Sequence, residues 1–120
     1  MAATDRTDEL MKRILRFRDE RDWGQFHDPK NLAEAITIEA SELLEQFLWK
    51  STDASRRLEN AELAKVQEEA ADIYIFLQLL CETLGIDLVE AALDKLETNA
   101  VKYPVSKARG SSRKYTELLT

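Results

Sequence analysis

The chain has 120 residues and 13.8 kDa, enough for one domain that buries a core without disulfides or a structural metal. Its formal net charge of −6 argues against a nonspecific nucleic-acid binder, and its single cysteine, Cys81, excludes a disulfide framework within the chain. We expect one domain over residues 1–120, with no secretory signal and no membrane span, located in the cytoplasm.

Only three glycines and two prolines interrupt long runs of helix-forming residues, so the sequence predicts an all-α protein. The first helix is expected over about residues 8–21, with Thr7 as its cap. The second is expected over about residues 30–49, because Asp28 followed by Pro29 is a helix-start signal.

The third helix is expected over about residues 58–84, after a polar connection at 50–57, and Gly85 closes it. Asp87 opens the fourth helix, which must stop before Pro104 because the residue preceding a proline avoids helical geometry. What remains is a loop or tail.

Carboxylates divide between two faces of the predicted second helix. Glu39 and Glu42 border its apolar stripe, whereas Glu34 and Glu45 point to the wetter side. The first two are therefore expected to be half-buried.

The predicted third helix also places an acid, Asp72, on a face shared with apolar side chains. Helical periodicity does not decide whether Glu68 or Glu69 accompanies it. Because the remaining sides of this helix are apolar too, we expect it to be central and its acids to be withdrawn from water.

Ionised carboxylates gathered away from water repel one another and need a compensating cation. Two pairs spaced three residues apart, one on each helix, could surround Mg²⁺ or Mn²⁺, which prefer oxygen ligands. The alternative is an ordinary solvated acidic face. A di-iron site is set aside, since it uses Glu-x-x-His pairs and the only histidine, His27, has no Glu three residues before it.

The sequence contains two further sets of candidate binding residues. Lys95, Asn99 and Lys102 form a polar stripe on the fourth helix, either as a solvated face or as phosphate ligands, and a basic tail follows at about residues 105–120. Aromatic rings either pack the core or stack on a nucleotide base; they are Trp23, Phe26, His27 and Trp49.

Two segments resemble a known family. IEASELLEQFLWK (38–50) and VQEEAADIYIFL (66–77) match the ExxE and ExxD motifs of the all-α nucleoside triphosphate pyrophosphohydrolases, the MazG-like family. The segments ERDWGQFHDPKNL (20–32) and SSRKYTEL (111–118), with Tyr103-Pro104 after Asn99, are similar to its dCTP pyrophosphatase branch.

The resemblance implies a MazG-like bundle of four to five helices that assembles as a homodimer or homotetramer. It implies a hydrolase that cleaves between the α and β phosphates of dCTP or a modified pyrimidine nucleotide, giving the monophosphate and pyrophosphate in nucleotide-pool cleansing. No nucleic-acid or membrane partner is expected. Two alternatives stay open: a catalytically silent interaction protein, and a pyrophosphohydrolase that prefers dUTP or damaged nucleotides.

The resemblance also assigns residues. It implies Mg²⁺, with Mn²⁺ as a possible substitute, held by the catalytic acids Glu39, Glu42, Glu69 and Asp72, and so prefers Glu69 over Glu68. The expected substrate-binding residues are Trp23, His27, Trp49, Lys95, Asn99, Lys102, Tyr103, Arg109, Arg113 and Lys114. Ile38 stands where the broad MazG pattern often has an acid, and Lys102 is a weaker bidentate phosphate ligand than Arg.

Overall fold

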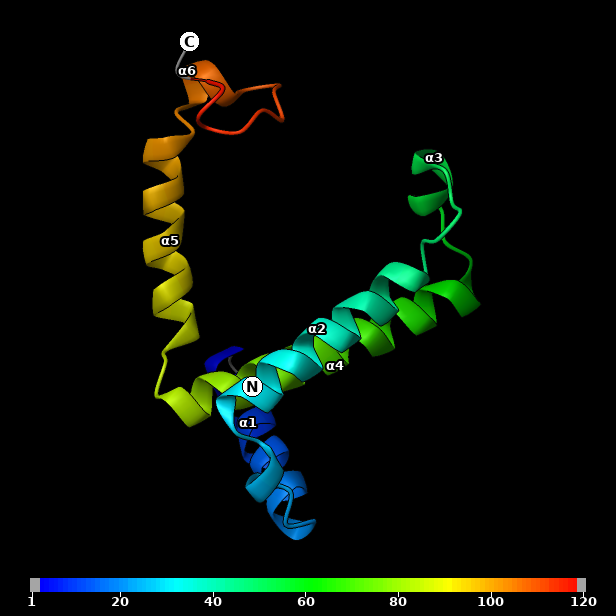
Figure 1. Ribbon diagram of the computed structural model, residues 1–120, viewed down its shortest axis with the longest axis vertical. Coiled ribbons are helices and arrows are strands. Elements are labelled where there is room, and N and C mark those ends of the chain that lie inside the picture. Colours follow the sequence, from blue (N-terminus) through cyan, green and yellow to red (C-terminus); the bar gives the residue numbers. More distant parts are fainter. Residues whose placement is uncertain (1–2, 119–120) are drawn as a thin grey trace. The chain divides into compact units, whose positions relative to one another are not determined.

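The computed structural model describes the backbone of residues 3–118 and the side chains of residues 6–118 (Figure 1). Within these ranges the chain has helices and turns but no strand, which confirms the all-α class. It forms two compact units, one up to Gly85 and one from Ile86 onward. The elements are α1 (Ala3–Glu20), η1 (Gly24–Phe26), α2 (Pro29–Glu45), α3 (Thr52–Ser55), α4 (Asn60–Leu84), α5 (Leu88–Lys102) and α6 (Val105–Ala108).

The first unit is built on an antiparallel hairpin of α2 and α4, which lie side by side along most of their length (Figure 1). Its core joins Ile14 of α1, Leu32 of α2 and Leu79 of α4, all under 7% exposed. Burying a side chain of this size contributes roughly 1.5–3 kcal/mol, so this contact among three helices fixes α1 against one end of the hairpin.

Local signals set where α2 begins. Asp28 Oδ1 accepts a hydrogen bond from the Asn31 backbone N–H at 2.8 Å, and Pro29 occupies the first turn, as predicted. The start predicted for α1 is wrong, because the helix already begins at Ala3 and Thr7 lies inside it. No glycine or proline between Ala3 and Thr7 interrupts the helix there.

The end predicted for α2 is also wrong. The helix stops at Glu45, and the next three residues form tighter turns in which each N–H reaches only three residues back, at 2.9–3.2 Å. Trp49 then adopts a left-handed backbone conformation with φ +68°. This turn, and not a continued helix, redirects the chain towards α3 and α4.

The start of α4 is tied to this turn by side chains. Glu59 and Glu62 form a capping box, in which the Glu62 carboxylate accepts from the Glu59 backbone N–H at 3.2 Å. The same Glu62 carboxylate pairs with the Lys50 ammonium group. The residue after Trp49 is therefore anchored to the first turn of α4.

The second unit begins as predicted and contains more structure than expected at its end. Asp87 Oδ1 accepts from the Glu90 N–H at 3.1 Å, and α5 stops at Lys102. In the segment expected as a tail, α6 forms one turn, and Tyr115 packs edge-on against Tyr103 with ring centroids 6.1 Å apart. The Lys102 ammonium lies 5.0 Å from the Tyr115 ring centre. None of the helices in the described part of the chain is long and apolar enough to cross a bilayer.

Candidate active site

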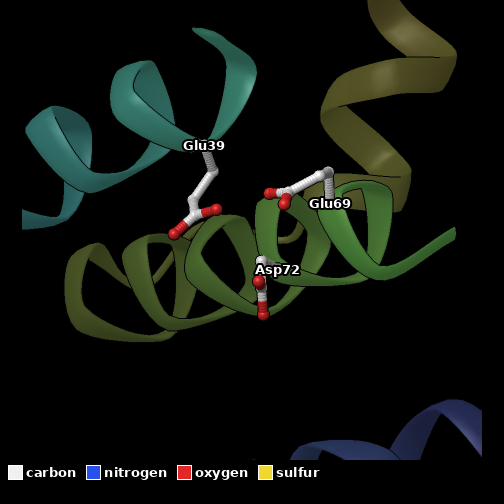
Figure 2. Close-up of side chains that lie close together, drawn as sticks. All are labelled: Glu39, Glu69 and Asp72. Carbon is white, nitrogen blue, oxygen red and sulfur yellow. The ribbon is translucent and has the colours of Figure 1, made fainter. Parts of the chain in front are cut away.

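Three carboxylates from two helices meet on the α2–α4 hairpin. Glu39 extends from α2 towards Glu69 and Asp72 on α4, and one oxygen atom from each of the three lies within 4.8 Å of the others (Figure 2). Glu39 is thirty or more positions from the other two in sequence, so the packing of the two helices creates the cluster.

Helix phase explains which acids enter this cluster. Glu39 and Glu69 are half-buried at the helix interface, whereas Glu68, Glu34 and Glu45 are exposed. Glu69, and not its neighbour Glu68, therefore faces Glu39. The position of Glu39 and Glu69 at the interface brings their two carboxylates together and also shields both carboxylates from water.

Glu42 lies one turn after Glu39 on α2 and is half-buried. Its carboxyl oxygen is not within the group of three, yet it is close enough to raise the pKa of both Glu39 and Glu69. The structure thus places three of the four predicted metal ligands in one cluster and the fourth at its edge.

The electrostatics of the cluster are unfavourable for three ionised acids. Burial raises the pKa of Glu39 to about 7, with further contributions from Glu69, Glu42 and Asp72. Burial, followed by Glu42 and Asp72, also raises the pKa of Glu69, while its contact with Glu39 acts in the opposite direction. One oxygen of Glu39 and one of Glu69 are buried and have no hydrogen-bond partner among the residues that the structure describes.

These orphaned oxygens fit a divalent cation. A buried carboxylate oxygen without a donor costs free energy unless a proton or a positive ion compensates it. An all-oxygen set at this separation matches the ligand preference of Mg²⁺ or Mn²⁺ better than that of zinc, which takes nitrogen and sulfur. The residues present are therefore suited to Mg²⁺.

A cavity of about 560 Å³ adjoins the acidic cluster. It lies among α1, the loop that contains η1, and α4, and most of its lining is apolar or aromatic. Asp72 borders the cavity and also belongs to the acidic cluster. A molecule with an apolar ring and a charged group could therefore place the ring in the cavity and the charge at the cluster.

Aromatic rings line this cavity in an edge-to-face series. Trp23 contacts Phe17 at 5.7 Å and His27 at 6.4 Å between ring centroids, and His27 contacts Phe76 of α4 at 6.4 Å. Burial and the charge of Arg18 lower the pKa of His27, so its imidazole is neutral at pH 7. Two of the predicted aromatic binding residues, Trp23 and His27, therefore lie together.

Trp49 is not part of this cavity. We expected it on α2 next to Glu42, but that placement is wrong because α2 has already ended, and the residue is 93% exposed. A tryptophan with positive φ is a conformational outlier that persists only where surrounding contacts enforce it. Here those contacts include the Lys50–Glu62 ion pair and the bond from the Lys50 N–H to the Phe47 carbonyl at 3.0 Å.

The strain at Trp49 gives a measurable expectation. Trp49→Gly should raise the free energy of unfolding by about 1 kcal/mol relative to Trp49→Ala, because only glycine adopts the left-handed conformation without a β-carbon clash. Both variants lose the indole, so the difference between their free energies of unfolding in urea reports the cost of the backbone conformation alone. Equal stability of the two would show that the positive φ carries no strain.

The other predicted binding residues belong to the second unit. Lys95 is exposed on α5, while Asn99, Lys102 and Tyr103 are half-buried near its end. The three binding residues predicted in the tail are exposed; they are Arg109, Arg113 and Lys114. All seven remain predictions as ligands of a substrate.

Sequence reasoning missed the cavity and several residues that line it. Phe17, Ile75 and Phe76 were visible as apolar positions on helix faces, but a periodic pattern does not show that space remains between two such faces. Arg18 was not predicted as a binding residue, although its position beside Ile14 and Phe17 on the apolar side of α1 is the signal that could have found it.

Comparisons with known proteins agree with the motifs. A sequence model of the MazG-like family matches residues 35–118. The chain is 41% identical over 114 residues to dCTP pyrophosphatase 1 of Rattus norvegicus and 42% identical over 114 residues to that of Homo sapiens, in each case covering 92% of this chain and 66% of the relative. This chain thus spans just under two thirds of the length of these relatives.

A solved structure supports the same grouping. A pyrophosphatase from Archaeoglobus fulgidus superposes with a TM-score of 0.78 at 42% sequence identity, covering 82% of this chain and 93% of that one. The sequence motifs, the acidic cluster on the α2–α4 hairpin and the family match over most of the chain agree. This chain belongs to the MazG-like family.

Proposed function

We propose that this chain is a Mg²⁺-dependent nucleoside triphosphate pyrophosphohydrolase, which converts dCTP or a related pyrimidine nucleotide to the monophosphate and pyrophosphate. The observation that carries the proposal is the acidic cluster of Glu39, Glu69 and Asp72 beside an aromatic cavity, with Asp72 common to both. The relatives named as dCTP pyrophosphatases support the choice of base.

The four acids have the chemistry that this reaction needs. Glu39, Glu42, Glu69 and Asp72 would hold the cation, and one of them would orient the attacking water for in-line attack on the α phosphorus. When bound, Mg²⁺ supplies Lewis acidity and neutralises charge on the phosphate oxygens. The buried, unpartnered oxygens of Glu39 and Glu69 are preformed acceptors for it.

The cavity suits the base. Trp23 and His27 would pack against the base, because aromatic rings stack on bases of every kind. Since Asp72 borders the cavity, a base held there leaves the phosphates at the acidic cluster. Five basic residues are proposed as ligands of phosphate oxygens, namely Lys95, Lys102, Arg109, Arg113 and Lys114, and Asn99 and Tyr103 as ligands of the sugar or a phosphate.

The direct test is product analysis. The protein is incubated with dCTP and Mg²⁺, and the expected products are dCMP and pyrophosphate in equal amounts, with none formed in EDTA. A panel of dUTP, dTTP, purine and 5-substituted pyrimidine triphosphates ranks the substrates. Failure to cleave any nucleotide, with or without Mn²⁺ in place of Mg²⁺, would favour the catalytically silent interaction protein.

We also propose that the protein works as a homodimer or homotetramer. On α2 and in the turn that follows it, Ile38, Leu44 and Leu48 are each more than half accessible, and so is Trp49. Because Trp49 is remote from the cavity lining of its own chain, a role in holding the base requires it to act at the site of a second copy.

The number of subunits is tested by measuring the molar mass of the protein in solution. Light scattering after size-exclusion chromatography should give two or four times 13.8 kDa. The double variant Leu44→Glu, Leu48→Glu should shift the protein towards the monomer and lower its activity, because charges in an apolar interface remain unpaired. A monomeric and fully active parent would contradict both the assembly and the role of Trp49.

A location in the cytoplasm completes the proposal. The one cysteine, Cys81, is buried and unpaired, which fits a reducing compartment.

A further inference from the structure

Arg18 lines the cavity beside the acidic cluster, and the proposed function gives this residue no role. Arg13 also borders the cavity, but its side chain is 73% exposed and pairs with Glu9 at 3.7 Å. The Arg18 side chain is only 23% exposed. Of the two arginines that line the cavity, Arg18 is therefore the more buried.

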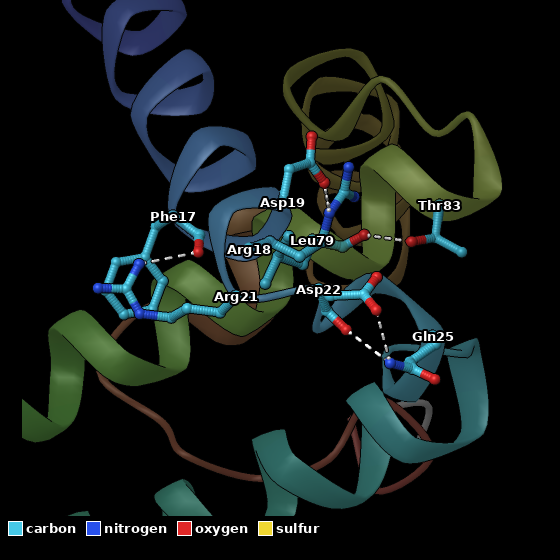
Figure 3. Close-up of polar contacts among 8 residues, drawn as sticks. All are labelled: Phe17, Arg18, Asp19, Arg21, Asp22, Gln25, Leu79 and Thr83. Carbon is cyan, nitrogen blue, oxygen red and sulfur yellow. Dashed lines mark hydrogen bonds and ion pairs between the residues drawn. The ribbon is translucent and has the colours of Figure 1, made fainter.

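Local contacts hold Arg18 in place. Its Nε donates to Asp19 Oδ1 at 2.8 Å, as Figure 3 shows. Its backbone carbonyl accepts from the Trp23 N–H at 3.0 Å, which closes the chain into the loop after α1. Gly24 of that loop passes so near that a β-carbon there would lie 3.6 Å from Arg18 Nε. Asp19 and Gly24 therefore both lie beside the Nε atom of this side chain.

The far end of Arg18 keeps unused donors. A guanidinium carries five N–H groups, and Asp19 engages the one on Nε. Within the described residues, the two terminal nitrogens have no acceptor. In a cavity lined mostly by apolar side chains, such donors are expected to serve a bound molecule.

His27 complements this donor group. Its Nδ1 is buried and has no hydrogen-bond partner in the described part of the chain, and its ring is neutral at pH 7 because burial and the Arg18 charge lower its pKa. A neutral imidazole has one nitrogen that accepts a hydrogen bond. The cavity thus presents a charged donor fork and a neutral side chain that can accept.

We propose that Arg18 is a specificity-determining residue whose terminal N–H groups donate in parallel to N3 and O2 of a cytosine-type base. The inference rests on the proposed function, which places the base in this cavity. Cytosine offers N3 and O2 as adjacent coplanar acceptors, and a guanidinium fork pairs with such acceptors as it does with N7 and O6 of guanine in DNA. Its 4-amino group supplies a donor for His27.

The same geometry disfavours uracil and thymine. Both carry a hydrogen on N3, so a donor of the base would face a donor of Arg18. A buried, unmatched donor pair is more costly than the loss of a favourable contact. Arg18 thereby selects dCTP and its 5-substituted forms over dUTP and dTTP, through a hydrogen-bond pattern that an apolar pocket cannot supply.

The test measures kcat/KM of the full chain with Mg²⁺ for dCTP, dUTP, and 2-deoxyribose 5-triphosphate, which has no base. Arg18→Met should lower the value for dCTP roughly ten- to hundred-fold, mainly through KM, as expected for the loss of charge-assisted hydrogen bonds. The value for dUTP should rise, because the donor that faces its N3–H is gone, and the value for the base-free triphosphate should stay within about threefold of the parent, so the preference for dCTP is lost. Arg16→Met, at an exposed position of α1 outside the cavity lining, is the matched control and should leave all three unchanged.

Two further measurements keep the test decisive. His27 is the only histidine, so its proton resonances report the cavity directly, and Arg18→Met should raise its pKa if the guanidinium lies beside the ring. Arg18→Lys keeps the stem and charge without the planar fork, so it should retain the fold and still lose discrimination between dCTP and dUTP.

Several outcomes would overturn the inference. Equal losses for all three triphosphates in Arg18→Met would make Arg18 a phosphate ligand, and an unchanged dCTP-to-dUTP ratio in both variants would exclude it from base selection. A parent that cleaves no nucleotide would refute the proposed function instead. The two failures are therefore distinguishable.

Discussion

Asp72→Asn is expected to lower kcat/KM for dCTP by at least about a hundred-fold, because it removes one negative oxygen from the cation site without changing the size of the side chain. Asp72 is the sharpest target in the cluster, since it also borders the cavity and so links the two halves of the site. Glu69→Gln should have an effect of the same order. Rates are measured at saturating Mg²⁺ and at several concentrations below it.

The same helix offers a matched control. Glu68 neighbours Glu69 in sequence but is exposed, so Glu68→Gln changes the same charge outside the cluster and should leave turnover within about twofold. If Asp72→Asn and Glu69→Gln behaved like Glu68→Gln, the acidic cluster would not be the metal centre.

In the metal-free protein, Glu39 is expected to contribute a loss of stability as the pH rises from about 4.5 to about 7. In this range the folded chain keeps a proton on Glu39, whose pKa is raised to about 7, while the unfolded chain has already released it near its ordinary value of 4.5. The folded state therefore binds more protons, and the free energy of unfolding falls with increasing pH. The raised pKa of Glu69 acts in the same direction.

A divalent cation should reverse this loss. Mg²⁺ binds the folded site and replaces the missing protons, and it adds about 2.7 kcal/mol when its concentration is a hundred times Kd. The measurement is urea unfolding in EDTA and in Mg²⁺ at pH 5, 6, 7 and 8. The largest stabilisation by Mg²⁺ is expected at the two highest pH values, where the carboxylates are ionised.

Glu39→Gln separates this effect from the general acid response of the protein. A neutral amide has no proton to release, so the variant should be more stable than the parent at pH 8 in EDTA and should gain much less from Mg²⁺. Glu45→Gln, exposed on the same helix, should follow the parent. A parent whose stability in EDTA rose from pH 5 to 7 by the same amount as that of Glu39→Gln would contradict the raised pKa.

Local sequence codes were sufficient for the helix boundaries that depend on neighbouring residues. Asp28 and Asp87 cap α2 and α5 through bonds to an N–H three residues ahead, and Gly85 ends α4 in the left-handed conformation that glycine adopts most readily. Where no capping residue or glycine marked the end of a helix, the predicted boundary was wrong. The end of α2 is the clearest case, because Gln46, Phe47 and Leu48 are compatible with helix and the turn there is fixed by Lys50 reaching Glu62.

The candidate active site, too, was predictable from the sequence only in part. Sequence alone determined that Glu39 and an acid one turn before Asp72 lie on half-apolar helix faces, because a period of 3.6 residues decides the face, and family resemblance selected Glu69. Only the tertiary structure decided that these oxygens meet within 4.8 Å, that a cavity remains between α1 and α4, and that Arg18 lies against it. Periodicity specifies direction around one helix, whereas the distance between two helices depends on the fit of all the side chains that separate them.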